Sequence, residues 1–399
     1  MSTGGFSKAR LDQLRDVMAG YVQRAELPGL TWLVSRRGET HVDAVGTKAV
    51  GAGGSMARDT IFRISSMTKP VTAVAALILL EECKLRLDDP VEAFLPELGN
   101  RRVLKRLDGP LDDTVPANRS ITVRDLLTFR LGYGFVAEPL PQPIQDALNE
   151  LGQGPPGATE PPAPDEWMRR LGTLPLLHQP GEKWMYNTGS DVLGVLIARA
   201  AGAPLEVFLR ERIFEPLGMR DTGFHVAAGD IDRLATSYST DPDTGALLLH
   251  DEPGGQWSRP PAFPSGAGGL VSTVDDFLAF SRMLANFGAH DGERIVSRPS
   301  IETMTTDQLT PEQKAVSGLV PAWFDSHGWG FGVGVVTRRI EPSEPVGQYG
   351  WDGGLGTCWR VDPSEEMITI LMTQKAWTSP NPPNVCRDFW TSAYAAIDD

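Results

Sequence analysis

The sequence predicts an α/β protein of the α+β type, in which a sheet formed by both ends of the chain carries an inserted, mostly helical domain. Strand-like segments occur near the start of the chain, in LTWLVSRRGETHVDAVG, and again near its end, in GWGFGVGVVT, GTCWRVDP and MITILMTQ. The long stretch between them has helical periodicity. Because the sheet needs both ends of the chain, we interpret the middle as an insertion.

The domain boundaries are predicted from the positions at which strand-like and helical sequence patterns replace one another. Residues 1–84 and 265–399 are expected to form the sheet domain, and residues 85–264 the helical domain. Within the helical domain, residues 137–164 are crowded with proline and glycine. A loop of this length in a compact protein is either a linker or a functional lid, and since helical pattern resumes on both sides we interpret it as a lid.

Composition narrows the possible partners. The 399 residues are 41% hydrophobic and 22% charged, as in soluble globular proteins, with a net charge of −14 from 51 acidic and 37 basic residues. An acidic surface repels nucleic-acid phosphates and anionic lipids. The sequence also has no apolar run near the roughly 20 residues that span a bilayer. We therefore expect no nucleic-acid or membrane partner; the oligomeric state is not predicted.

The N-terminal sequence MSTGGFSKARLDQLRDVMAGYVQRAEL favours a mature amphipathic helix over a signal peptide, because no apolar stretch follows a basic start. The three cysteines are odd in number and form no CxxC pair, which favours neither a disulfide framework nor a zinc site; they are Cys83, Cys358 and Cys386. We expect a cytoplasmic protein.

The stretch ISSMTKPVTA places Ser66 and Lys69 three residues apart at the head of an apolar run. On a helix these residues share a face, at the N-terminus where the dipole favours negative charge. Burial disfavours the charged form of lysine, and a neutral amine can accept the proton of a serine nucleophile. A capping serine beside a surface lysine is the alternative. The apolar helix that follows favours a buried lysine.

Two further segments carry candidate site residues. In WMYNTGSDVLGVLI, Tyr186 precedes an apolar helix, where it could either shuttle a proton or pack at a domain boundary. In YGWDGGLGTCWRVDP, a strand runs into Gly353 and Gly354, which let a backbone approach a ligand closely or simply form a hairpin turn. If the segment is functional, the amides of Gly354 and Ser66 are predicted to form an oxyanion hole.

In this order, the three segments resemble the serine β-lactamase and penicillin-binding protein superfamily, most closely its class C branch and the family VIII carboxylesterases. The similarity covers nearly the whole chain: RISSMTKPVTAVAALILLEE resembles the first motif and its helix, and PSGAGGLVSTVDDFLAF the GG-x-x-ST-x-x-D helix start. The resemblance implies a β-lactamase/transpeptidase-like fold, in which an antiparallel sheet is flanked by helices. It also implies that Ser66 is the nucleophile, Lys69 its base partner and Tyr186 the second-motif tyrosine.

Several positions depart from the family pattern. The second motif usually reads Tyr-x-Asn, whereas Thr188 stands two residues after Tyr186. The segment that usually reads LLTHTSG has become LLTFRLGYG, in which Tyr133 is a candidate substrate contact. The resemblance places Trp351, Asp352 and Gly353 at the KTG or HxG triplet and implies that they bind substrate, with Trp351 in place of the cationic lysine.

Other enzyme classes fit less well. No GxSxG elbow is present, so an α/β-hydrolase triad lacks its nucleophile. The histidines show no HExxH motif and no close pairing, so we expect each of them to be structural. We expect the protein to use neither a metal nor a cofactor. The histidines are His41, His178, His225, His250, His290 and His327.

The leading hypothesis is a serine hydrolase that cleaves short-chain carboxylic esters through an acyl-enzyme on Ser66. The same site could instead serve a β-lactamase, a D-amino-acid peptidase or other amidase, or an acyltransferase, since these reactions share the acyl-enzyme. A third alternative is a catalytically silent binding module. The natural substrate is not predicted.

Overall fold

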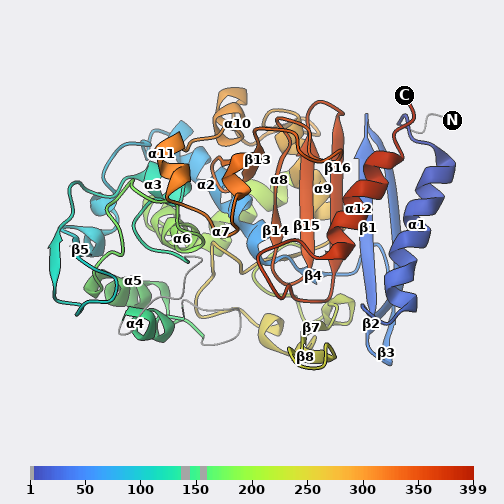
Figure 1. The fold of residues 1–399 in the computed structure, drawn as a ribbon, viewed down its shortest axis with the longest axis horizontal. Coiled ribbons are helices and arrows are strands. Elements are labelled where there is room, and N and C mark those ends of the chain that lie inside the picture. Colours follow the sequence, from blue (N-terminus) through green and yellow to red (C-terminus); the bar gives the residue numbers. More distant parts are fainter. Residues whose placement is uncertain (1–3, 136–143, 153–159) are drawn as a thin grey trace.

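The computed structural model describes residues 4–135, 144–152 and 160–399. Its centre is an eight-stranded sheet with antiparallel pairing throughout, as the family resemblance implied (Figure 1). In spatial order the strands are β12 (His327–Trp329), β13 (Gly334–Val336), β14 (Tyr349–Gly353), β15 (Thr357–Asp362), β16 (Met367–Thr373), β1 (Gly29–Arg36), β2 (Glu39–Ala49) and β3 (Ala52–Ser55).

The two ends of the chain meet in the middle of this sheet. Strand β1 pairs with β16 over the register Leu30↔Thr373 to Arg36↔Met367, and with β2 on its other side. The N-terminal and C-terminal strands therefore form one sheet.

Both faces of the sheet are covered, which explains why all eight residues of β1 are buried. Leu30, Trp32 and Val34 pack in one apolar cluster with helices α1 (Lys8–Gln23) and α12 (Asn384–Ala395). Leu33, which points the other way, belongs to the main core.

The main core is organised around helix α2 (Thr68–Glu81). Every residue from Thr68 to Leu79 is buried, as the apolar pattern predicted. Helix α9 (Val274–Ala285) packs beside it against β16 and β1.

The helical region extends from the end of the molecule away from β1–β3 to its middle, where its last helix contacts α9 (Figure 1). Its helices are α3 (Val123–Leu127), α4 (Ile144–Glu150), α5 (Pro164–Thr173), α6 (Thr188–Ala201), α7 (Leu205–Leu209) and α8 (Glu215–Leu217), with a π-helical stretch, Arg210–Phe214, between the last two. Helices α10 (Arg298–Met304) and α11 (Pro311–Ala315) follow later in the chain.

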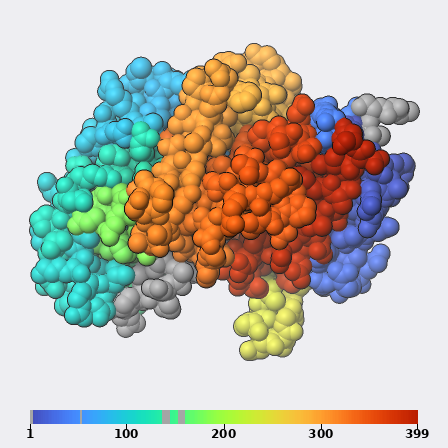
Figure 2. Space-filling view, turned by 45° about the horizontal axis from the view of Figure 1, so that its top comes forward, coloured from blue at the N-terminus to red at the C-terminus, as the bar shows by residue number. Residues whose placement is uncertain are grey.

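Four short antiparallel pairs complete the fold. They are β4 (Phe62–Arg63) with β9 (Val271–Ser272), β5 (Arg102–Leu104) with β6 (Thr114–Pro116), β7 (Ser237–Thr240) with β8 (Leu247–Asp251), and β10 (Ala289–His290) with β11 (Glu293–Arg294). The β7–β8 hairpin stands out from the body of the molecule (yellow in Figure 2) and exposes Leu248 and Leu249.

The proposed lid, residues 137–164, contains helix α4, whose Ile144 and Leu148 are buried in the main core. Residues 137–143 and 153–159 lie outside the described residues. The lid thus remains a prediction, as do the domain boundaries.

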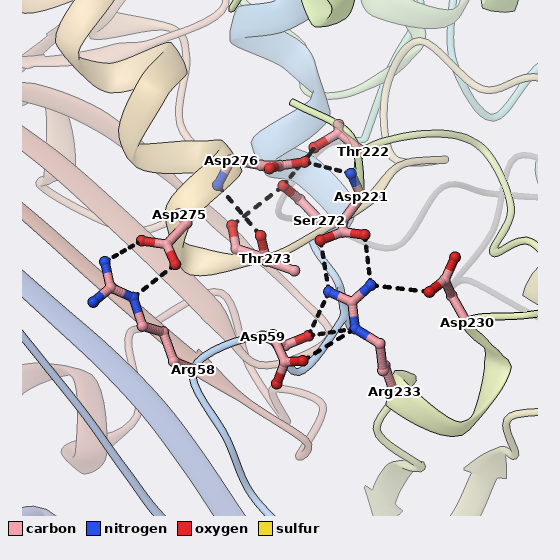
Figure 3. Close-up of polar contacts among 10 residues, drawn as sticks. All are labelled: Arg58, Asp59, Asp221, Thr222, Asp230, Arg233, Ser272, Thr273, Asp275 and Asp276. Carbon is pink, nitrogen blue, oxygen red and sulfur yellow. Dashed lines mark hydrogen bonds and ion pairs between the residues drawn. The ribbon is translucent and has the colours of Figure 1, made fainter. Parts of the chain in front are cut away.

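An ionic cluster joins the segments that flank β4 and α9 (Figure 3). Arg233 donates to both carboxylate oxygens of Asp221, at 2.6 and 2.7 Å, and to the backbone carbonyl of Asp59. Beside it, Arg58 forms a two-bond pair with Asp275 at the start of α9. These pairs hold the segment before β4 against the start of α9 and the loop that follows α8.

Within the described ranges, no single helix is long and apolar enough to cross a membrane. By length and composition alone, the helices Thr188–Ala201 and Leu205–Leu217 meet the criteria as a pair, but they are bent by 80° at the break between them.

Candidate active site

Ser66 lies in a short 3₁₀ turn, Ser65–Met67, that redirects the chain from strand β4 into helix α2. Ser65 has a φ of 45°, in the left-handed region that residues other than glycine rarely adopt. Such strain persists only where the surrounding structure enforces it, and it is often found at functional sites. The turn leaves Ser66 partly exposed on the wall of a cavity of about 1510 Å³, between the buried Ser65 and Met67.

Lys69 lies one turn along α2 and is fully buried. Its Nζ is 2.8 Å from Ser66 Oγ and donates to the backbone carbonyl of Ala267 at 2.7 Å. Burial lowers the pKa of Lys69 to about 7, although the charge of Asp191 acts in the opposite direction. A large share of Lys69 is therefore neutral near neutral pH and can accept the Ser66 proton.

Tyr186 precedes helix α6, and its hydroxyl shares a hydrogen bond with Ser66. Its ring centroid is 4.5 Å from Lys69 Nζ. Burial raises the pKa of Tyr186 above its ordinary value, so the side chain is a phenol rather than a phenolate. The next residue, Asn187, has a φ of 89°, a second strained position beside Ser66.

Aromatic side chains surround Tyr186, which remains half-buried on the wall of the cavity. Their ring centroids lie 5.6 to 6.5 Å from that of Tyr186. They belong to Phe129, Phe135, Trp184, Trp329 and Trp351.

Trp351, which is expected to bind substrate, also contacts another residue of the site. Its indole Nε1 donates a hydrogen bond to Tyr186 Oη at 2.7 Å. A tryptophan at the triplet position thus supplies a donor to the tyrosine hydroxyl while also lining the cavity.

Asp191 is a site residue that the sequence analysis missed. It lies in the first turn of α6, and its Oδ1 accepts hydrogen bonds from Ser265 Oγ at 2.6 Å and the Ala267 amide at 3.1 Å. It lines the same cavity as Ser66. The signal available in the sequence was a carboxylate inside the apolar run TGSDVLGVLI.

Gly354 follows β14 and lines the cavity with Ser66. A Cβ added to Gly354 would meet no atom within 4 Å, so this backbone borders open space. The oxyanion hole formed by the amides of Ser66 and Gly354 remains a prediction.

Gly353 has a packing role in the structure, and the substrate contact expected of it stays a prediction. A Cβ there would lie 2.2 Å from the carbonyl oxygen of Ile64 and 2.2 Å from Thr357 Oγ1. The absence of a side chain lets β14 approach the backbone that leads into Ser66. Gly353 is not among the residues that line the cavity.

Asp352 borders the cavity, but its charge is not free to meet a substrate. Arg360 donates two hydrogen bonds to its carboxylate, at 2.6 and 2.9 Å. The guanidinium lies over the ring of Trp390 on α12. The pair therefore lies on the α12 side of the sheet, while the adjacent Trp351 reaches Tyr186 on the other side.

The expectation that Tyr133 binds substrate is corrected by its environment. Tyr133 is fully buried, and its hydroxyl accepts a hydrogen bond from Arg101 at 2.7 Å and donates to the carbonyl of Leu174. It satisfies a buried arginine in the helical region. Two residues later, Phe135 lines the cavity and its amide bonds to the Tyr186 carbonyl.

Among the described residues, no group of three or more histidine, cysteine, aspartate or glutamate side chains is placed to hold a metal ion.

Comparison with known proteins places this geometry in a family. Residues 14–384 match the family described as Beta-lactamase. The chain is 41% identical over 377 residues to Protein Rv1367c of Mycobacterium tuberculosis, covering 92% of this chain and 88% of the relative. It is 30% identical to Esterase EstB of Burkholderia gladioli, covering 94% and 92% of the two chains. The chain therefore belongs to the Beta-lactamase family, and its esterase relative identifies it as an enzyme.

Solved structures agree on the fold. The hydrolase EstCE1, described as having promiscuous acyltransferase activity, superposes with a TM-score of 0.79 at 24% identity, covering 97% of this chain and 99% of the other. A mutant of simvastatin synthase from Aspergillus terreus superposes with a TM-score of 0.78 at 22% identity, covering 97% and 95%.

Proposed function

We propose that the protein hydrolyses carboxylic esters through an acyl-enzyme on Ser66, with Lys69 as the base. The observation that carries the proposal is the 2.8 Å contact between Ser66 Oγ and a fully buried Lys69 Nζ whose pKa is lowered to about 7. A serine is a weak nucleophile until an adjacent base accepts its proton, and a neutral lysine is such a base.

In the acylation step, the Ser66 proton passes to Lys69 Nζ as Oγ attacks the ester carbonyl. The bond to the leaving alkoxide then breaks, and the alkoxide takes up a proton. Tyr186, hydrogen-bonded to Ser66 and held as a phenol, is placed to pass that proton from Lys69 to the leaving oxygen. Water attacks the acyl-enzyme by the reverse route, which restores Ser66.

The negative charge on the carbonyl oxygen needs donors that are in place beforehand. The amides of Ser66, at the N-terminal end of α2, and of Gly354, beside open space, are the proposed donors.

Neutral esters fit this site better than penicillins or cephalosporins. In the penicillin-recognising relatives the triplet lysine supplies positive charge for the antibiotic carboxylate, and here Trp351 stands in its place. Arg360 is already engaged by Asp352. Loss of a charge-assisted hydrogen bond costs roughly 1.5–3 kcal/mol, about ten- to a hundredfold in binding.

Acyl transfer is the second candidate function. A relative from Penicillium decumbens, 26% identical over 387 residues, is named Acyltransferase calJ. The cavity of about 1510 Å³ exceeds the roughly 300–1,000 Å³ usual for one ligand, so an acceptor alcohol has room beside the acyl-enzyme. Such an acceptor would replace water in the second step.

The first experiment measures turnover of 4-nitrophenyl butyrate by the wild-type protein and by Ser66→Ala. We expect the variant to lose at least about 10³-fold in kcat with an unchanged melting temperature. Retention of more than about a tenth of the activity would refute the assignment of Ser66. Equal kcat/KM for a chromogenic cephalosporin and the butyrate ester would refute the preference for neutral esters.

A further inference from the structure

The carboxylate of Asp191 is buried close to Lys69, and the sequence motifs of the site do not include it. We propose that Asp191 is a positioning residue that stabilises the ammonium form of Lys69 created when Lys69 takes the Ser66 proton. This inference rests on the proposed function and concerns the same site. It gives the lysine base a counter-ion.

The contacts of the two residues converge on one short segment. Asp191 Oδ1 accepts hydrogen bonds from Ser265 Oγ and the Ala267 amide, and Lys69 Nζ donates to the Ala267 carbonyl. The segment is held at one end by the helical region through α6 and at the other by α2. Asp191 and Lys69 are thereby fixed relative to each other.

Among the described residues, the charged group that acts on each member of this pair is the other member. From α2 the charged group facing Asp191 is Lys69, and from the 265–268 segment the groups are the Ser265 hydroxyl and the Ala267 amide. Asp191 is in turn the charged group that acts on Lys69. Tyr186, on the segment before α6, faces Lys69 as a neutral phenol. Each member of the pair is thus the electrostatic partner of the other.

If Asp191 only held the 265–268 segment by hydrogen bonds, it would not need a charge. An asparagine would accept the same two hydrogen bonds through its single oxygen without the cost of burying a carboxylate. Burial raises the pKa of Asp191, which shows that the site resists the charge. The hydrogen bonds from Ser265 and Ala267 offset part of this cost. A positive charge offsets more of it when Lys69 carries a proton, which is the state formed as Ser66 attacks.

The proton balance of the step is simple. The O–H bond of Ser66 breaks, an N–H bond forms at Lys69 Nζ, and Oγ bonds to the substrate carbonyl carbon. The positive charge appears on Lys69 while Asp191 remains a carboxylate. Opposite charge nearby in a low-dielectric site favours this protonated form, as the aspartate of a serine protease triad favours its imidazolium.

The test compares Asp191→Asn with wild type by the pH dependence of kcat/KM for 4-nitrophenyl butyrate. Loss of the charge lowers the pKa of Lys69, so the acid limb should move to lower pH by about one unit or more. The pH-independent plateau should fall about 10²-fold, because a weaker base and an unsupported ammonium both raise the barrier. A merely structural role would lower the plateau without moving the limb.

Asp276→Asn is the matched control, because Asp276 is also a buried first-turn carboxylate that accepts one amide and one hydroxyl hydrogen bond. Its acid limb and plateau should match wild type. An unmoved limb in Asp191→Asn, or an equal displacement in Asp276→Asn, would overturn the proposal.

Asp191→Glu keeps the negative charge, so it tests the role of Asp191 even if Asp191→Asn does not fold. Its acid limb should stay within about half a unit of wild type, and a limb displaced by a full unit would contradict the proposal. The pH dependence of Ser66 labelling by a fluorophosphonate separates the two claims. No labelling of wild type would defeat the proposed function, whereas equal pH profiles for wild type and Asp191→Asn would defeat only the role of Asp191.

Discussion

Asp191 and Asp276 occupy similar positions in the structure but have different electrostatic partners. Each lies in the first turn of a long helix, and each accepts hydrogen bonds from one backbone amide and one hydroxyl group. Burial raises the pKa of both, to about 6 for Asp276. Local structure alone therefore does not distinguish them.

The difference lies in the charges around them. The positive charge of Lys69 acts on Asp191 and lowers its pKa, and Asp191 lines the cavity. Asp276 is acted on by two further carboxylates, while Arg233 and Arg58 are engaged by Asp221 and Asp275 (Figure 3). A buried acid with a raised pKa indicates a functional site only when a cation and a cavity accompany it.

The largest expected effect comes from removing Lys69, the electrostatic partner of Asp191. Lys69→Met should lose about 10³-fold or more in kcat, because the base is lost. It should also lower the stability of the protein, because the buried Asp191 carboxylate loses the positive charge that lowers its pKa. Assays with 4-nitrophenyl butyrate and urea unfolding measure the two effects.

The corresponding change in the region around Asp276 is Arg233→Met. Arg233 is partly exposed, and its partners can be hydrated, so we expect unchanged activity and a smaller loss of stability. Equal losses of kcat in the Lys69 and Arg233 variants would show that the two regions do not differ as described.

A smaller change in rate is expected from Trp351→Phe, which keeps an aromatic ring but removes the donor to Tyr186 Oη. A neutral hydrogen bond is worth about 0.5–1.5 kcal/mol, so kcat should fall by up to about tenfold. Trp32→Phe, in the cluster between the sheet and helices α1 and α12, is the control and should leave kcat unchanged. Wild-type activity in Trp351→Phe would mean that this bond does not contribute to catalysis.

Asp276→Asn should leave the rate unchanged and alter stability alone. In wild type the pKa of Asp276 is raised to about 6 in the folded protein from about 3.8, so folding is opposed increasingly as pH rises from about 4 to about 6. The Asn variant lacks this titration. It should therefore be more stable than wild type at pH 7, by about 1–3 kcal/mol, with the difference vanishing near pH 4.

Thermal unfolding of the two proteins at pH 4 and pH 7 measures this difference. A variant that is less stable than wild type at pH 7 would show that the Asp276 carboxylate is needed to hold the loop at Asp221 and Thr222.

The fold could be predicted because its signals are local. The apolar run after Lys69 is long enough to mark a central helix, and the strands at the two ends are bounded by turn residues. The proximity of Ser66 and Lys69 also follows from helical spacing.

The other contacts depend on pairings between segments far apart in the sequence. Asp191 meets Lys69, and Asp352 meets Arg360, only after the tertiary structure has formed. Tyr133 was expected at the substrate because it stands in the altered LLTFRLGYG segment. The buried Arg101, whose position no local pattern reveals, accounts for its actual place.

The pairing of β1 with β16 has a consequence for biosynthesis. Strand β1 leaves the ribosome early, and both of its faces are buried in the folded protein. Yet one of its two hydrogen-bonding partners, Met367–Thr373, is made more than three hundred residues later. Contacts so distant in sequence form late and slowly. A nascent chain of this protein therefore carries an exposed sheet edge through most of its translation, and chaperone binding to residues 29–36 is the expected protection against aggregation.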